Sequence, residues 1–300
     1  MTWLRIVLTA SAFLIVAQAA AALNIFACEP EWGSLAKELA GDRASIYVAT
    51  SALQDPHRIE ARPSLIARAR TADLMVCTGA ELEVGWLPLL LSQSGNAKIQ
   101  LGRPGYFEAA DYAALLDTPR VLDRSQGDVH PAGNPHIHLD PHNIAHVAEA
   151  LSLRLVELDP ANGDAYRARS SQFLARWQEA VARWERQGAA LRGLPVVVYH
   201  QNLTYFIHWL KLREAGALEP KPGLPPSAGH LGLLLARLQK QPAKAVVRAA
   251  YNEPRAAEWL AERAGIPSVV VPFTVGGSER AKDLFGLFDD TLARLLAVAR

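Results

Sequence analysis

Apolar residues occur along the chain in two patterns, short continuous runs and longer stretches with helical spacing. The short runs are typical of strands buried on both faces of a parallel sheet, and they lie at residues 23–28, 44–50, 72–79, 195–200, 243–251 and 267–273. Stretches with helical spacing lie between these runs. This alternation predicts α/β architecture with parallel sheets.

One long amphipathic stretch divides the two groups of strands. Its apolar side chains are spaced by 7, 4, 4 and 3 residues, at Tyr166, Phe173, Trp177, Val181 and Trp184. This spacing puts them on one face of a helix, and we interpret that face as core. We therefore predict two doubly wound α/β lobes, at residues 23–161 and 193–300, joined by one long helix at residues 162–192.

The first 22 residues have a different composition. Arg5 is followed by an apolar run and then by small residues, Ala20 to Ala22, that fit a signal-peptidase site before Leu23. The apolar run is shorter than the roughly 20 residues that cross a bilayer. We therefore interpret residues 1–22 as a cleaved secretory signal that leaves no membrane anchor, and no Cys lies at the cleavage region to carry a lipid.

The charge balance excludes two classes of partner. The 31 Lys and Arg residues nearly cancel the 30 Asp and Glu residues, which leaves a formal net charge of +1. No basic run is interleaved with aromatic residues, so neither nucleic acid nor an anionic membrane surface is expected to bind.

Two cysteines, Cys28 and Cys77, lie at the ends of the first and third apolar runs. Disulfides persist in exported proteins. If the two predicted strands are neighbours, as the first and third strands of a doubly wound sheet are, the two sulfurs can meet in a disulfide. The alternative is a pair of small buried apolar residues.

Three histidines are predicted to lie where strands end. His57 follows the second strand, His136 precedes a helix, and His200 ends the strand in the second lobe. Parallel sheets bind ligands at the carboxyl ends of their strands. A single histidine there is most often a hydrogen-bonded surface residue, but three at equivalent edges of two lobes indicate a shared site. The sequence has no nucleophile elbow, P-loop or Gly-rich dinucleotide motif that would favour catalysis.

Several segments give the chain a resemblance to a known family. They are DPHRIEARPS, ADLMVCTGAELEVGWLP, NPHIHLDPHN, VVVYHQNLTYF and LEPKPGLPPSAGHL. With them the chain resembles the periplasmic zinc- and manganese-binding components of bacterial ABC importers, the TroA-like cluster A-I group. The resemblance implies a metal site in the cleft between two lobes, a periplasmic location, and an inner-membrane ABC permease as partner. We expect a monomer.

The resemblance also implies which histidines bind the metal. His57, His136 and His200 match the first three ligand positions of the family. Zinc-binding members often carry a long histidine-rich loop, and here only His130 and His138 are candidates for an accessory role in metal capture.

The fourth ligand position departs from the family pattern. Family members usually have an Asp after the final strand, whereas this chain reads VVVPFTVGGSE, with Val275 or a neighbour in that place. Water or a carboxylate from elsewhere would complete the site. Glu253 is the first candidate, and its alternative role is a carboxylate at a helix N-terminus, where the helix dipole favours it.

Three imidazoles favour Zn²⁺, which binds nitrogen tetrahedrally, over Mn²⁺, which prefers more oxygen ligands. Manganese-binding members typically have Glu at the third position, where this chain has His200. The predicted function is therefore capture of Zn(II) and delivery to the permease, without enzyme activity. Mn(II) is the less favoured cargo. Two alternatives share the site: a periplasmic zinc-dependent hydrolase with three His ligands, and a zinc chaperone.

Overall fold

The computed structural model describes residues 22–119 and 127–299. The predicted signal peptide lies outside the described residues except for its last position. Among the described residues, none of the helices combines the length and the apolar character that a transmembrane span requires.

The first lobe is built on a four-stranded parallel sheet with the strand order β2-β1-β3-β4. The strands are β1 (Leu23–Ala27), β2 (Ala44–Val48), β3 (Leu74–Cys77) and β4 (Tyr106–Glu108). Alternate side chains of β1 and β3 point to opposite faces, and both faces are covered by helices. Helices α1 (Pro30–Ala40) and α4 (Pro141–Leu158) cover one face, and α2 (Pro63–Arg70) and α3 (Leu87–Ser94) cover the other.

The second lobe repeats this arrangement with the strand order β6-β5-β7-β8. Its strands are β5 (Pro195–Val198), β6 (Arg213–Ala217), β7 (Ala245–Ala249) and β8 (Ser268–Val271). Its helices are α6 (Thr204–Leu210), α7 (Ala228–Lys240), α8 (Pro254–Ala264) and α9 (Leu284–Ala299). Both sheets therefore have the doubly wound form that the apolar runs predicted.

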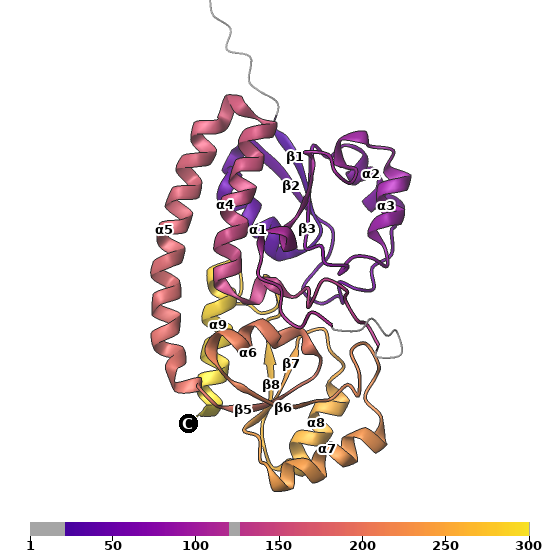
Figure 1. The fold of residues 1–300 in the computed structure, drawn as a ribbon, viewed down its shortest axis with the longest axis vertical. Helices are drawn as coiled ribbons and strands as arrows, with labels where there is room; N and C mark the ends of the chain where they lie inside the picture. The colour runs from indigo at the N-terminus through magenta and orange to yellow at the C-terminus, as the bar shows by residue number, and fades with distance from the viewer. Residues whose placement is uncertain (1–21, 120–126, 300) are drawn as a thin grey trace, which may run out of the picture.

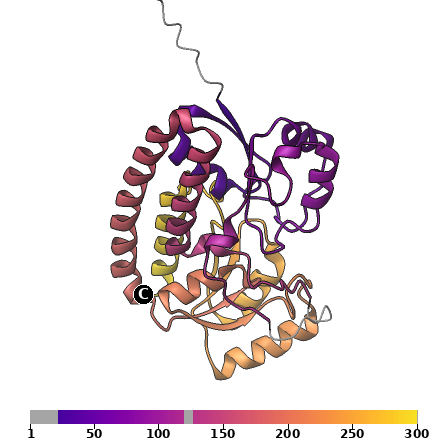
Figure 2. The same ribbon diagram turned by 45° about the horizontal axis from the view of Figure 1, so that its top comes forward.

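Helix α5 (Gly163–Gly188) runs along both lobes, and α9 packs beside it (Figures 1 and 2). Its predicted apolar stripe is core: Trp177 and Trp184 are buried, and the ring of Phe288 from α9 stacks on Trp184 at 4.9 Å. The indole N–H of Trp177 donates to the Pro141 carbonyl at 2.7 Å, which ties α5 to the start of α4. One hydrophobic cluster thus runs from the first lobe through α5 and α9 into the second.

Two of the four edge strands, β4 and β6, are absent from the sequence-based prediction, and both have weak patterns. Strand β4 is three residues long. Strand β6 reads REAGA, is exposed at its first two residues, and pairs with β5 through a register shift between Val196 and Val197. Short, charged edge strands lack the continuous apolar run that identifies a buried strand.

The predicted disulfide is present. Strands β1 and β3 are neighbours, with Ala27 paired to Val76, so the cysteines that follow them in register lie side by side. Cys28 and Cys77 form a disulfide with their Cα atoms 4.8 Å apart. The bond lies at the carboxyl edge of the sheet, where it joins the ends of β1 and β3.

We expect the disulfide to contribute about 2–4 kcal/mol to stability, because it closes a loop with a sequence separation of 49 residues. Urea unfolding of the metal-free double variant C28A/C77A should give a free energy of unfolding lower than that of the wild type by this amount. Reduction of the wild type should reproduce the loss. Unchanged unfolding midpoints in both experiments would contradict the prediction.

Candidate metal centre

Three histidines from both lobes meet in one group. His57 comes from the loop after β2, His136 from the turn before α4, and His200 from the end of β5. One ligand nitrogen of each lies within 4.8 Å of the other two. The ring centroids are 5.4 Å apart for His57 and His136, 5.8 Å for His57 and His200, and 5.4 Å for His136 and His200. Two imidazoles on one tetrahedral Zn²⁺ have centroids about 5 Å apart, given Zn–N bonds of about 2.0–2.1 Å.

A short sequence motif orients the two histidines of the first lobe. In Asp55-Pro56-His57 the Asp carboxylate accepts the backbone N–H of His57 at 3.1 Å and faces its Nδ1 at 2.8 Å. In Asn134-Pro135-His136 the Asn oxygen makes the same two contacts, at 3.0 and 2.8 Å. In both motifs Nδ1 is the donor, so Nε2 is left with a free lone pair.

The histidine of the second lobe is held in the same way by a more distant carboxylate. Nδ1 of His200 lies 2.7 Å from Glu219, which also accepts the backbone N–H of Gly223 at 2.8 Å. Nε2 of His57 and Nε2 of His136 are buried and make no hydrogen bond. Buried polar atoms nearly always have partners, so these two atoms indicate that an electron-pair acceptor belongs between the rings.

The motif recurs a third time in Asp140-Pro141-His142, and this copy lies apart from the site. Asp140 again accepts the backbone N–H of His142 and contacts its Nδ1, both at 2.9 Å. The His142 side chain is 52% exposed, and its Nε2 faces Glu185 at 3.4 Å. The motif therefore fixes the ring, while the position in the fold decides whether the free nitrogen meets other ligands. This repeat of Asp or Asn, Pro and His is present in the sequence but was not among the predicted features.

Burial and nearby charges shift the pKa values of two groups at the site, His136 and Asp55. Burial lowers the pKa of His136 well below its ordinary value, and the charges of His57 and His200 lower it further. Burial alone would raise the pKa of Asp55, but the hydrogen bond and charge of His57 outweigh it and hold that pKa below its usual range. Neutral imidazole beside ionised carboxylate is the state that binds a metal cation.

His138 lies outside this group. Its side chain is fully buried, and its Nε2 lies 2.9 Å from the Phe273 carbonyl while its Nδ1 lies 3.2 Å from Glu31. It therefore connects the loop after β8 to the first lobe. This position argues against accessory metal capture by His138, because the ring has no access to solvent.

The loop after β8 brings no carboxylate to the three histidines. Phe273 packs its ring against His136, at 5.5 Å between centroids. The Thr274 hydroxyl is buried and hydrogen-bonded to Glu31, and Val275 is half-buried. Packed side chains therefore occupy the place where the family pattern has an Asp, and this loop supplies no substitute ligand.

Glu253 is exposed at the N-cap of α8 and makes no capping hydrogen bond with its side chain. It lines the same pocket as His57 and His200, but its carboxylate lies outside the group of converging ligand atoms. The carboxylate therefore lies at a helix N-terminus, as the alternative role expects, and not among the converging ligand atoms.

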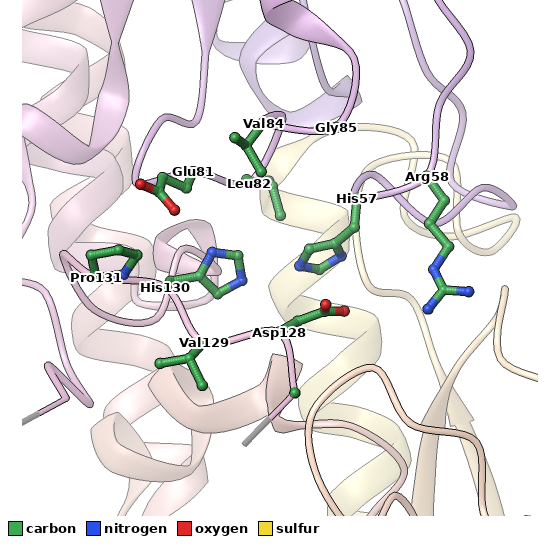
Figure 3. A pocket seen from close by; sticks show the side chains of 11 residues that line it. His57, Arg58, Glu81, Leu82, Val84, Gly85, Asp128, Val129, His130 and Pro131 are labelled. Atoms are coloured by element: carbon green, nitrogen blue, oxygen red, sulfur yellow. The ribbon is translucent and has the colours of Figure 1, made fainter. Parts of the chain in front are cut away.

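His130 lies beside the group, on the segment that precedes the Asn134 motif. Its ring centroid is 5.4 Å from that of His57, and the two rings face each other across a pocket (Figure 3). Burial, followed by the charge of His57, lowers the pKa of His130 to about 4. It is neutral, and its Nε2 is buried without a hydrogen-bond partner.

The fold is that of a known family. The model of the family described as ZnuA, zinc-uptake complex component A periplasmic, matches residues 25–298. The chain belongs to the ZnuA family. A crystal structure of ZnuA superimposes on it with a TM-score of 0.77 and 22% identity, covering 93% of this chain and 98% of that one; this likeness shows a shared fold.

Relatives of this ZnuA-family chain are named for different metals. The manganese ABC transporter substrate-binding lipoprotein scaA of Streptococcus gordonii is 26% identical over 157 residues, covering 51% of this chain and 47% of that protein. The high-affinity zinc uptake system protein ZnuA of Bacillus subtilis (strain 168) is 20% identical over 260 residues, covering 82% and 77%. The chain spans less than half the length of the streptococcal relatives it matches.

Because Asp55 fixes the tautomer and direction of His57, its removal should weaken metal binding without removing a ligand. We expect D55A to lower Zn²⁺ affinity by about 10–100-fold, the usual effect of losing an outer-shell partner. D140A is the matched control, since it breaks the same motif at His142 and should leave the affinity unchanged. Competition with a chromophoric chelator measures both, and equal affinities for the two variants would contradict the assignment.

Proposed function

We propose that this protein binds Zn²⁺ between its lobes in the periplasm and delivers it to an inner-membrane ABC permease. The observation that carries the proposal is the convergence of His57, His136 and His200, whose Nδ1 atoms are held by Asp55, Asn134 and Glu219. Two ligands come from the first lobe and one from the second. Separation of the lobes therefore removes a ligand, which is how docking on a permease would release the ion.

Zinc is the cargo that this donor set favours. Three neutral imidazole nitrogens suit Zn²⁺, whereas Mn²⁺ prefers oxygen ligands and a higher coordination number. The two nearest carboxylates, Asp55 and Glu219, face Nδ1 atoms of the ligand histidines and are occupied as their acceptors. Cu²⁺ binds such nitrogen sites more tightly than Zn²⁺, so selection among these ions depends on which metal the periplasm supplies.

The same contacts favour a carrier over a hydrolase. A hydrolytic zinc site needs a general base near the metal-bound water. The carboxylates closest to the three rings are engaged with the ligand histidines, as described above. The ZnuA family is one of transport proteins, and we propose a monomer that passes its ion to a permease, with a chaperone role differing only in the recipient.

Single substitutions H57A, H136A and H200A should each lower Zn²⁺ affinity by more than about 100-fold, because loss of a ligand exceeds loss of its outer-shell partner. H142A removes an exposed histidine that is oriented by the same motif and should bind as the wild type does. Isothermal titration or chelator competition at neutral pH measures the series. Wild-type affinity in all three ligand variants would contradict the proposed function.

The wild type should prefer Zn²⁺ to Mn²⁺ when both compete for the apo protein, since the converging ligand atoms among the described residues are three imidazole nitrogens. Equilibrium dialysis against equal concentrations of the two ions, followed by metal analysis, tests this directly. Predominant retention of manganese would contradict the assignment of zinc as cargo.

A further inference from the structure

Among the described residues, no fourth ligand atom lies within the group formed by His57, His136 and His200, and Phe273 and the buried Thr274 occupy the loop where the family pattern has a carboxylate. Tetrahedral zinc needs four ligands. Besides the acceptors of the three Nδ1 atoms, the ionisable side chains that line pockets shared with these histidines and could act as ligands are Glu81, Asp117, Asp128, His130 and Glu253.

We propose that His130 is the fourth ligand, so that the ion is held by four imidazoles; this rests on the proposed function. His130 stands as far from His57 as His136 does, with 5.4 Å between ring centroids in both pairs. Its Nε2 is buried without a partner, which is also the state of Nε2 in His57 and His136. His130 lies outside the group of atoms within 4.8 Å, so binding of the ion draws its ring inward.

The other nitrogen of His130 is already committed. The ring makes a hydrogen bond to the Ala80 backbone, and since Nε2 has no partner this bond uses Nδ1. His130 therefore presents Nε2 as the free nitrogen, with an acceptor behind Nδ1, as His57, His136 and His200 do.

The turn that carries Ala80 is strained and fixed. Ala80 and Glu81 have φ values of 49° and 63°, in a region that residues other than glycine rarely adopt. The turn is held by Glu83, which is buried and accepts the backbone N–H of Thr78 at 2.7 Å and of Gly79 at 3.2 Å. Strain of this kind persists where the surroundings enforce it, and it gathers at functional sites.

The segment that carries His130 is also tied to the second lobe. The Asp128 N–H donates to the Pro222 carbonyl at 2.9 Å. At Gly127 an added Cβ would lie 2.2 Å from the same carbonyl oxygen, so the two backbones are in direct contact. The contacted loop carries Gly223, whose N–H donates to Glu219, the acceptor for His200. His130 and His200 are thus supported by one contact between the lobes.

Asp128 and Glu253 are less suited to the fourth position, as are the exposed Glu81 and Asp117. Asp128 is exposed, and its carboxylate packs against the Gly223 backbone, where an added Cβ would meet Oδ2 at 1.9 Å. Glu253 is exposed at the start of α8. Both can remain solvated, whereas the buried Nε2 of His130 has no such alternative.

The test is X-ray absorption at the zinc edge on the full mature protein, combined with Zn²⁺ affinity, for the wild type, H130A, D128N and the exposed control H142A. We expect four imidazoles in the wild type, D128N and H142A, and three imidazoles with one oxygen in H130A. H130A should also lose at least about tenfold in affinity. Unfolding of the metal-free proteins checks folding, and H130Q replaces H130A if the latter is unstable.

Three imidazoles in the wild type, or an unchanged spectrum and affinity in H130A, would overturn the inference. So would slower zinc association in H130A with unchanged coordination, because His130 would then guide the ion without binding it. Loss of binding in D128N together with wild-type behaviour of H130A would assign the position to Asp128. In each of these outcomes, loss of zinc by H57A, H136A and H200A would leave the proposed function standing.

Discussion

The structure depends on holding imidazole nitrogens in its interior without hydrogen bonds. Leaving a buried polar atom unpaired costs about 1–3 kcal/mol, and the fold does so at Nε2 of His57 and of His136 within one site. Binding of a cation satisfies both atoms at once. The folded protein already has these unpaired atoms in the absence of the ion. Binding of a cation to the folded state alone therefore stabilises it by mass action.

Each ring stays in place because its other nitrogen is held. Asp55, Asn134 and Glu219 provide acceptors for the three Nδ1 atoms, and two of these acceptors also hold the backbone of the histidine they orient. Proline in the middle of the motif fixes the local backbone. The three histidines therefore lie on loops, and the hydrogen bonds at each histidine restrain the loop that carries it.

Aromatic side chains on α5 and α9 hold the two sheets that carry these loops in position relative to each other. Trp177 and Trp184 of α5 pack against Phe288 of α9, and the indole of Trp184 donates to Asp289 at 2.6 Å. Movement of one lobe relative to the other would disturb these aromatic contacts and the hydrogen bond between Asp128 and Pro222. A long packed helix permits less hinge motion than a flexible linker would.

The sequence allowed prediction of the features that have strong local signals. Continuous apolar runs identified the central strands, the aromatic spacing identified α5, and the equivalent strand ends of Cys28 and Cys77 indicated the disulfide. Strands β4 and β6 were missed because edge strands are short and polar. The different environments of His130 and His138 could not be predicted, since they depend on the strained turn at Ala80 and on Glu31 and Phe273, which are distant in the sequence. The repeated motif of Asp or Asn, Pro and His is visible in the sequence. Which of its copies contribute a histidine to the site depends on their positions in the fold.

The most direct test of this account is a crystal structure of the zinc-loaded protein with anomalous data collected on both sides of the zinc edge. The account predicts one strong anomalous peak about 2.0–2.1 Å from Nε2 of His57, His136 and His200, the nitrogens left free by Asp55, Asn134 and Glu219. A peak coordinated through Nδ1, or an ion bound away from these three rings, would contradict it.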